Sequence, residues 1–338
     1  MINVNMTGWI KQVIQEKQVT AVPIMTHPGI EMKGYTVREA VSNGKAHFEA
    51  IMEMTKAYPC AMATTIMDLT AEAECFGADV VFSDHAVPSV AGRLLKSVDD
   101  IEQLQVPSLQ SGRIPAYLKA NLLAAKAIAD RPVISGCIGP FSLAGRLYDM
   151  SELMILIYEQ PEAAHLLLRK CNEFILKYCM ALKATGSQGV MMAEPAAGLL
   201  SNEDCKQFSS PYVREVVQRV QDDHFIVVLH NCGNTGHCTE AMVTTGAAAY
   251  HFGNKCDMEE VTREVPPHVL SMGNIDPVSV LKDSVPEKIK AVVTDLLTKM
   301  KDYSNFVLSS GCDIPPQTPV ENIRAFFEAL DDYNQVPK

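Results

Sequence analysis

The sequence lacks the features that would direct it to a membrane or to nucleic acid. No apolar run in its 338 residues approaches the ~18 residues of a membrane span. Its first residues show neither the basic nor the apolar region of a signal peptide. No run rich in lysine and arginine occurs, and 40 acidic against 29 basic residues give a net charge of -11, which repels phosphate backbones and anionic bilayers. We therefore expect a cytoplasmic protein that binds neither nucleic acid nor a membrane.

Linkers, repeats and a dinucleotide-binding motif are also missing. No low-complexity segment or internal repeat divides the chain, and its 47% apolar content is enough for one large core. We therefore predict a single domain over residues 1–338. The first expected strand is followed by Thr26-His27-Pro28-Gly29 rather than by the G-x-G-x-x-G of a Rossmann fold.

Short apolar segments alternate with helical patterns along the whole chain. Segments bounded by Gly, Pro or Asp predict buried strands at 20–25, 61–66, 133–138, 189–194, 225–230, 247–252, 268–273 and 306–310. Helical spacing lies between them, as in 114–130 and 162–185, and the segment 9–17 predicts an extra helix that closes one end. This alternation favours a (β/α)8 TIM-type barrel with an extra N-terminal helical segment; an open Rossmann-like sheet is the second choice.

Polar residues follow most of the expected strands. In a barrel of this type the functional groups lie at the carboxyl ends of the strands. The residues found there are His27, Asp68, Glu72, Glu194, His230, Cys232, Tyr250, Asn274, Asp276 and Cys312. We therefore predict that one rim of the barrel forms the site.

His230, Cys232 and Cys312 carry the sharpest signal on this rim. Residues two apart at a strand end point the same way, and Cys312 ends the eighth strand at the same mouth. One nitrogen and two sulfur ligands suit Zn²⁺, and three protein ligands are typical of a catalytic site. Ordinary buried thiols and a core histidine are the alternative. His237 and Cys238 are competing ligands, but they fall in the next helix and would point elsewhere.

Several carboxylates are further candidates. Glu194 directly follows a strand core, where burial penalises a charge. It is a candidate fourth ligand, a residue that orients the histidine, or part of a loop salt bridge. Asp68 and Glu72 are candidates for substrate binding, whereas the dipole of a helix that starts near them explains Glu74.

Five segments together resemble a known family. They are DLTAEAECFGADV at 68–80, GPFSLAG at 139–145, HNCGNT at 230–235, MGNIDPV at 272–278 and LSSGCDIPPQTPVENIRAF at 308–326. The combination resembles the uroporphyrinogen decarboxylase superfamily. The H-x-C…C pattern is similar to its zinc-dependent branch, the methylcobalamin:coenzyme M methyltransferases, and the resemblance extends over nearly the whole chain.

The resemblance implies a reaction and a set of partners. It implies that His230, Cys232 and Cys312 bind Zn²⁺ with Glu194 nearby, and that a methyl group passes from methylcobalamin or another methylated corrinoid to a small-molecule thiol such as coenzyme M. No corrinoid-binding D-x-H-x-x-G occurs here, so the corrinoid arrives on a partner protein or as a free cofactor. Arg146, with Lys33 second, is the candidate for the sulfonate of coenzyme M. Relatives form monomers and dimers, and we expect a homodimer.

Two alternatives remain open. The tetrapyrrole decarboxylase of the same superfamily needs no metal and holds its polycarboxylate substrate through an Arg-bearing M-R-Q-A-G-R segment. Here that segment is MTHPGIEMKG, without arginine, so the charge pairing that many carboxylates need is missing. A metal-free uroporphyrinogen decarboxylase-like lyase of porphyrin metabolism is therefore disfavoured. The other alternative is a non-catalytic barrel that binds a corrinoid or a thiol.

Overall fold

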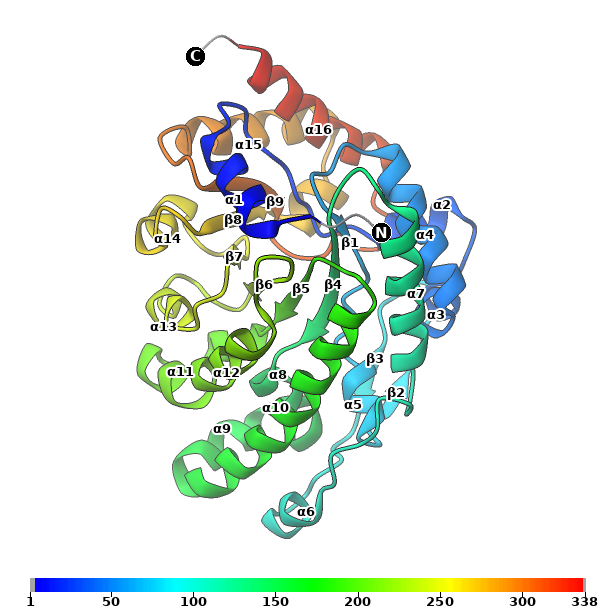
Figure 1. The fold of residues 1–338 in the computed structure, drawn as a ribbon, viewed down its shortest axis with the longest axis vertical. Helices are drawn as coiled ribbons and strands as arrows, with labels where there is room; N and C mark the ends of the chain where they lie inside the picture. The colour runs from blue at the N-terminus through cyan, green and yellow to red at the C-terminus, as the bar shows by residue number, and fades with distance from the viewer. Residues whose placement is uncertain (1–3, 337–338) are drawn as a thin grey trace.

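A parallel β-sheet forms the centre of the molecule. The computed structural model describes residues 4–336, and Figure 1 shows helices arranged around the strands. The sheet has seven strands in the order β1-β4-β5-β6-β7-β8-β9, and every neighbouring pair is parallel. The strands are β1 (Ala63–Thr64), β4 (Val133–Ile138), β5 (Gly189–Ala193), β6 (Ile226–Asn231), β7 (Ala249–Phe252), β8 (Leu270–Ile275) and β9 (Phe306–Ser310). They correspond to seven of the eight strands predicted from the sequence.

The predicted first strand, 20–25, occupies the eighth position in the ring of barrel strands but does not form a regular strand. It makes one parallel bridge, between Ala21 and Leu308 of β9. On its other edge the Ala61 amide donates to the Ala21 carbonyl at 2.9 Å. Pro23 has no N–H to donate on that edge, which interrupts the ladder toward β1. The segment therefore closes the ring between β9 and β1, and the architecture is the (β/α)8-type barrel that the alternation predicted.

Helices cover the outside of the barrel. They are α1 (Met6–Gln15), α2 (His27–Met32), α3 (Val37–Ser42), α4 (Gly44–Ala57), α5 (Ala71–Cys75), α6 (Val98–Gln103), α7 (Ile114–Ala127), α8 (Pro140–Tyr148), α9 (Met150–Glu159), α10 (Pro161–Ala184), α11 (Asn202–Phe208), α12 (Ser210–Val220), α13 (Thr239–Val243), α14 (Met258–Glu264), α15 (Pro286–Lys299) and α16 (Val320–Gln335). A 3-10 turn, η1 (Pro195–Leu199), and a π turn, η2 (Pro277–Lys282), lie between them. The helices predicted at 114–130 and 162–185 are confirmed as α7 and α10. Within residues 4–336 no helix combines the length and apolar character that a bilayer crossing requires.

The extra N-terminal helix lies at the amino ends of the strands. Met6 and Ile10 of α1 belong to the buried apolar cluster inside the barrel, together with Ile226 and Leu270, the first residues of β6 and β8. The helix predicted from residue 9 to 17 is therefore present from Met6 to Gln15 and covers the floor. With that end covered, the opposite end, at the carboxyl ends of the strands, remains as the mouth.

A small hairpin was not predicted from the sequence. Strands β2 (Asp79–Val81) and β3 (Ser89–Ala91) pair antiparallel in a separate sheet. Each strand is only three residues long and mostly exposed. Such short, exposed strands carry little of the apolar pattern on which the prediction depends.

Candidate metal centre at the mouth of the barrel

His230 is the last inward-facing residue of β6. Ile226 and Val228 of the same strand belong to the apolar cluster inside the barrel. Because side chains alternate along a strand, His230 points inward as well, and only 1% of it is exposed. The apolar interior of the barrel therefore ends on an imidazole at the mouth.

An Asx turn and a close backbone contact hold the loop after β6 in place. The Asn231 Oδ1 atom accepts hydrogen bonds from the amides of Gly233 at 3.0 Å and Asn234 at 2.9 Å, which is an Asx turn. A Cβ atom on Gly253 would lie 2.7 Å from the Cys232 Cα atom, so glycine lets the loop after β7 pack directly against it. These contacts fix the position from which Cys232 reaches the mouth.

The structure brings His230, Cys232 and Cys312 together. Their ligand atoms all lie within 4.8 Å of one another. His230 is buried, whereas the two thiols are partly exposed at the rim. The His230 Nε2 atom is buried and has no hydrogen-bond partner in the described part of the chain. An unpartnered nitrogen beside two thiols fits the N, S, S donor set of a catalytic zinc site.

The two thiols share a hydrogen bond that separates their acidities. Cys232 accepts this bond from the Cys312 S–H, which lowers the pKa of Cys232 and raises the pKa of Cys312. Cys232 is therefore the member of the pair that loses its proton first.

Glu194 lies outside this cluster, in contrast to the prediction that it is a fourth ligand. Met191 and Ala193 of β5 face the interior, so the following residue turns to the helical layer. There its carboxylate accepts the amides of Phe141 and Ser142 at the start of α8, where the helix dipole favours an anion. Burial raises the pKa of Glu194 to about 7, although these hydrogen bonds lower it.

His27 lies beside the cluster, paired with a residue that was not predicted. Its Nδ1 atom is 2.9 Å from an Asp313 carboxylate oxygen, and Asp313 directly follows Cys312. Burial has the largest effect and lowers the pKa of His27, but the charge and hydrogen bond of Asp313, with the charges of Asp68 and Glu31, together raise this pKa overall. The pair places a histidine and a carboxylate at the mouth next to the two thiols.

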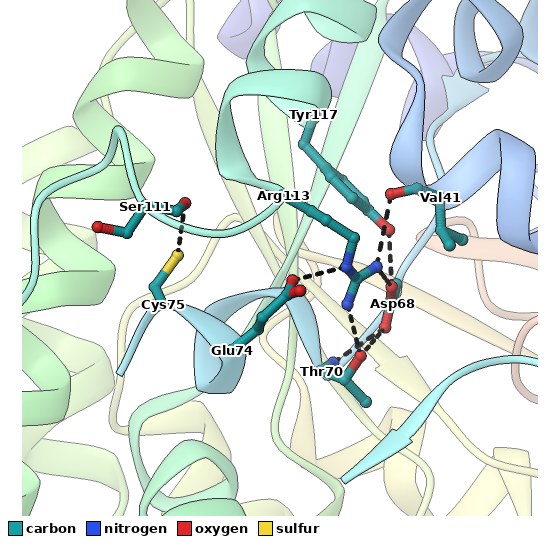
Figure 2. A network of polar contacts seen from close by, with 8 residues as sticks. All are labelled: Val41, Asp68, Thr70, Glu74, Cys75, Ser111, Arg113 and Tyr117. Atoms are coloured by element: carbon teal, nitrogen blue, oxygen red, sulfur yellow. Dashed lines mark hydrogen bonds and ion pairs between the residues drawn. The ribbon is translucent and has the colours of Figure 1, made fainter. Parts of the chain in front are cut away.

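Asp68 is occupied by other protein groups. It accepts hydrogen bonds from Thr70, from the Tyr117 hydroxyl at 2.9 Å and from Arg113. Arg113 also donates to Glu74 at 2.6 Å, and Figure 2 shows the guanidinium between the two carboxylates. The predicted substrate ligand is therefore part of a buried ion-pair network, and Arg113 is the partner that the sequence analysis missed.

Glu72 differs from Asp68 because one of its two carboxylate oxygens accepts no hydrogen bond from the described residues. Its Oε1 atom accepts the Ile138 amide at 2.9 Å. Its Oε2 atom is buried and has no hydrogen-bond partner among residues 4–336. Burial raises the pKa of Glu72 to about 7. Glu72 therefore remains a candidate for substrate binding.

Three further predicted site residues have local structural contacts. The Tyr250 hydroxyl donates to the Val243 carbonyl at 3.0 Å, in the helical layer outside the barrel. Asn274 donates to the Gly253 carbonyl at 2.9 Å, and Asp276 caps η2. Asn274 and Asp276 thus shape loops at the rim, whereas Tyr250 points away from the mouth.

A cavity of about 410 Å³ lies beside the rim and includes Arg146. Ser142, Leu199 and Leu69 line it with the exposed guanidinium. No acidic side chain within the described residues forms an ion pair with Arg146. A larger cavity, about 530 Å³, lies at the floor beside α1, away from the carboxyl ends of the strands.

The comparisons with known proteins identify the family. The family model of uroporphyrinogen decarboxylase (URO-D) matches residues 10–333. The chain belongs to the uroporphyrinogen decarboxylase family. Within it, the methylcobamide:CoM methyltransferase MtbA of Methanosarcina mazei is 31% identical over 270 residues, which are 79% of this chain and 78% of that protein. The uroporphyrinogen decarboxylase of Coxiella burnetii is 27% identical over 336 residues, 93% of this chain and 91% of its own.

Solved structures support the fold of this family member. A methyltransferase from Methanosarcina mazei superposes with a TM-score of 0.87 at 22% identity, over 98% of this chain and 99% of that chain. A B12-independent methionine synthase from Shewanella sp. reaches a TM-score of 0.58 at 12% identity, over 93% of this chain and 94% of that chain. The resemblance found in the sequence motifs is thus confirmed, and the family member is related to methyltransferases as well as to decarboxylases.

Tyr250 and His251 both stand at the end of the sixth predicted strand, and alternation along the strands would have selected His251 rather than Tyr250. His230 pairs with His251 in the register of β6 and β7, and paired residues on neighbouring strands point to the same side. The sequence analysis selected Tyr250 at this strand end. An inward-facing His230 predicts an inward-facing His251 and an outward-facing Tyr250.

Proposed function

We propose that this family member is a zinc-dependent methyltransferase that transfers a methyl group from a methylated corrinoid to a small-molecule thiol. The observation that supports this most directly is the cluster of His230, Cys232 and Cys312 with its unpartnered nitrogen. The 31% identity to the methylcobamide:CoM methyltransferase of Methanosarcina mazei supports the same reaction class.

Each ligand has a separate task in this proposal. A Zn²⁺ ion held by the three ligands would supply Lewis acidity that lowers the pKa of an incoming thiol. Cys232 and Cys312 give two negative charges, which offset the charge of the ion and leave a substrate sulfur electron-rich. Because His230 is buried and the thiols are partly exposed, a substrate approaches the cluster from the mouth.

The methyl donor comes from outside the chain. The sequence has no corrinoid-binding D-x-H-x-x-G, so we propose a partner protein that carries the corrinoid, or a free corrinoid. In the transfer, the thiolate sulfur bonds to the methyl carbon and the cobalt–carbon bond breaks, with both electrons of that bond remaining on cobalt. The proton of the thiol leaves before this step.

We propose that the cavity beside the rim receives the anionic end of a thiol such as coenzyme M. The Arg146 guanidinium lines this cavity and has no acidic partner among residues 4–336. A guanidinium binds sulfonate or carboxylate through charge-assisted hydrogen bonds. His27 and Glu72 are the other candidates for contacts with the substrate.

Metal content tests the proposal first. Protein purified without added metal should contain about one zinc per chain, and the double variant Cys232→Ser, Cys312→Ser should contain none. Cys75→Ser is a matched control, since Cys75 donates to the Ser111 carbonyl at 3.0 Å and a serine hydroxyl can donate there too. A folded parent that contains no zinc and takes up none would contradict the proposal and favour the metal-free lyase.

A single-turnover assay separates catalysis from binding. The zinc-loaded protein is mixed with methylcobalamin and coenzyme M, and the loss of the methyl–cobalt absorbance is followed together with the methylated thiol. Equal amounts of demethylated corrinoid and methylated thiol are expected. Corrinoid binding without any methyl transfer, to coenzyme M or to other thiols, would favour the non-catalytic barrel.

A further inference from the structure

A chain of buried polar groups lies behind His230. The His230 Nδ1 atom is 2.8 Å from the His251 Nδ1 atom, and the His251 Nε2 atom is 2.7 Å from the Ser309 hydroxyl. That hydroxyl donates to the Val22 carbonyl at 2.7 Å. None of these four residues is more than 1% exposed. This series of hydrogen bonds therefore runs through the buried interior of the barrel, from β6 through β7 and β9 to the segment that closes the ring.

The positions of the protons in this series of hydrogen bonds follow from the Ser309 hydroxyl. A serine hydroxyl has one hydrogen, and Ser309 donates it to Val22. The hydroxyl oxygen can then only accept from His251, so the His251 proton is on Nε2. A neutral His251 has its lone pair on Nδ1, and His230 must therefore donate from its own Nδ1 atom. The Nε2 atom of His230 is left with a lone pair.

We infer that His251 and Ser309 are positioning residues that fix His230 in the Nδ1–H tautomer and so prepare its Nε2 atom as a metal ligand. The proton order stands on the hydrogen bonds alone, while its use for metal binding rests on the proposed function. The Nδ1 atom of His230 is bonded to His251, so Nε2 is the ring nitrogen left for the ligand site, and it has no hydrogen-bond partner among residues 4–336. Only a nitrogen without a proton can bind a metal ion.

The surroundings of these hydrogen bonds disfavour the reversed arrangement of protons. The residues around the chain on the interior side are aliphatic, among them Val228, Ala249, Met272 and Val307, and they offer no alternative hydrogen bond. A reversed order would leave the Val22 carbonyl without the Ser309 hydrogen and would place an N–H of His230 toward the thiols. Buried polar groups without partners are costly. The inferred order satisfies every group of this network except the nitrogen that faces the ligand site.

Nitrogen NMR of the metal-free parent tests the proton order directly. In protein labelled with ¹⁵N-histidine, His230 should show a protonated Nδ1 and an unprotonated Nε2, and His251 the reverse. This pattern is expected before any metal is added. A protonated Nε2 on His230 would overturn the inference, whether or not the parent binds zinc.

Two serine variants test its consequence for metal binding. Ser309→Ala should lose the fixed tautomer of His230 and bind zinc about 10–100-fold more weakly, measured by competition with a chromophoric chelator. Ser271→Ala is the matched control: Ser271 is also fully buried, on neighbouring β8, and its hydroxyl bonds to Thr262 at 2.6 Å. This control should bind zinc as the parent does. Thermal unfolding of both variants verifies that they fold.

The outcomes separate the inference from the proposed function. If Ser309→Ala keeps the parental tautomer and zinc affinity, the positioning role is wrong although the zinc site stands. If the parent binds no zinc, the proposed function is wrong, and the tautomer measured by NMR still decides the proton order. If Ser309→Ala does not fold, His251→Leu replaces it in the same affinity measurement, with the same weakening expected because leucine can neither accept nor donate a hydrogen bond.

Discussion

At the scale of single residues, the side of the strand on which a residue lies decides its chemistry. His230 and Glu194 both come at the end of a barrel strand, and both are almost completely buried. His230 faces the interior and meets two thiols, whereas Glu194 faces the helices and caps α8. Ala193 pairs with His230 in the sheet, so a shift of one residue in this register turns Glu194 to the opposite side of the strand.

Glu72 should make the stability of the fold depend on pH. Burial raises its pKa from an ordinary value near 4.5 to about 7, so the unfolded chain releases this proton at a lower pH than the folded protein. The contribution of Glu72 to the free energy of unfolding is therefore fully present below pH 4.5 and is lost as the pH rises through 7. Glu72→Gln should therefore stabilise the protein by about 3 kcal/mol at pH 8 and have little effect at pH 4.5, measured by urea unfolding.

An exposed carboxylate provides the control for this prediction. Glu173 forms an exposed pair with Lys177, so Glu173→Gln should change stability little at either pH. The prediction for Glu72 is wrong if Glu72→Gln changes stability equally at pH 4.5 and pH 8.

Arg146 should discriminate between thiols by their charge. Arg146→Gln removes the guanidinium from the cavity beside the rim, and a charge-assisted hydrogen bond at a site open to solvent contributes about tenfold in binding. The KM for coenzyme M should rise by about this factor, whereas the KM for neutral 2-mercaptoethanol should not change. Equal effects on both thiols would show that Arg146 does not contact the anionic group.

At the scale of elements, polar networks and proline determine how neighbouring segments join. The Arg113 network links the start of α7 to Asp68 and to Glu74 of α5. Pro23 turns the predicted first strand into an extended segment with a single bridge. At Arg113 a long-range contact sets the structure, whereas at Pro23 the missing N–H of a single residue does.

Removing Arg113 should destabilise the junction between α5 and α7. Asp68 would be left buried without its cation, and breaking a buried ion pair costs about 3–5 kcal/mol. Arg113→Leu should show this loss in chemical denaturation. Lys177→Leu breaks an exposed pair and should cost less than about 1 kcal/mol. Adding Asp68→Asn to Arg113→Leu should recover part of the loss, and no recovery would argue against an unpaired charge as its cause.

At the scale of the whole molecule, the candidate metal site joins distant parts of the barrel. His230 lies in β6, while Cys232 and Cys312 follow β6 and β9. The polar groups behind His230 reach the segment that closes the ring. An ion bound there would link these parts in the folded state only, because the unfolded chain does not preform the site. The single domain and the homodimer remain predictions at this scale.

Chelation should lower the melting temperature of the zinc-loaded parent. A ligand that binds only the folded state at 100 times its dissociation constant adds about 2.7 kcal/mol of stability. Chelator treatment followed by dialysis should remove that contribution, and added zinc should restore it, measured by calorimetry. The double variant Cys232→Ser, Cys312→Ser should melt at one temperature with or without zinc. A parent that does not respond to zinc would contradict a site that links the barrel.

The sequence by itself determined the barrel and the identity of the three clustered residues. Buried strands, helical spacing and the covered floor are local patterns, and strand ends meet at one mouth in any such barrel. The tertiary structure alone decided the roles of Glu194, Tyr250 and Asp68 and revealed the contacts of His251 and Arg113. The physical reason is that these roles depend on where each strand stops and on which distant side chain fills the space opposite. Arg113 lies 45 residues from Asp68, and no local pattern encodes that contact.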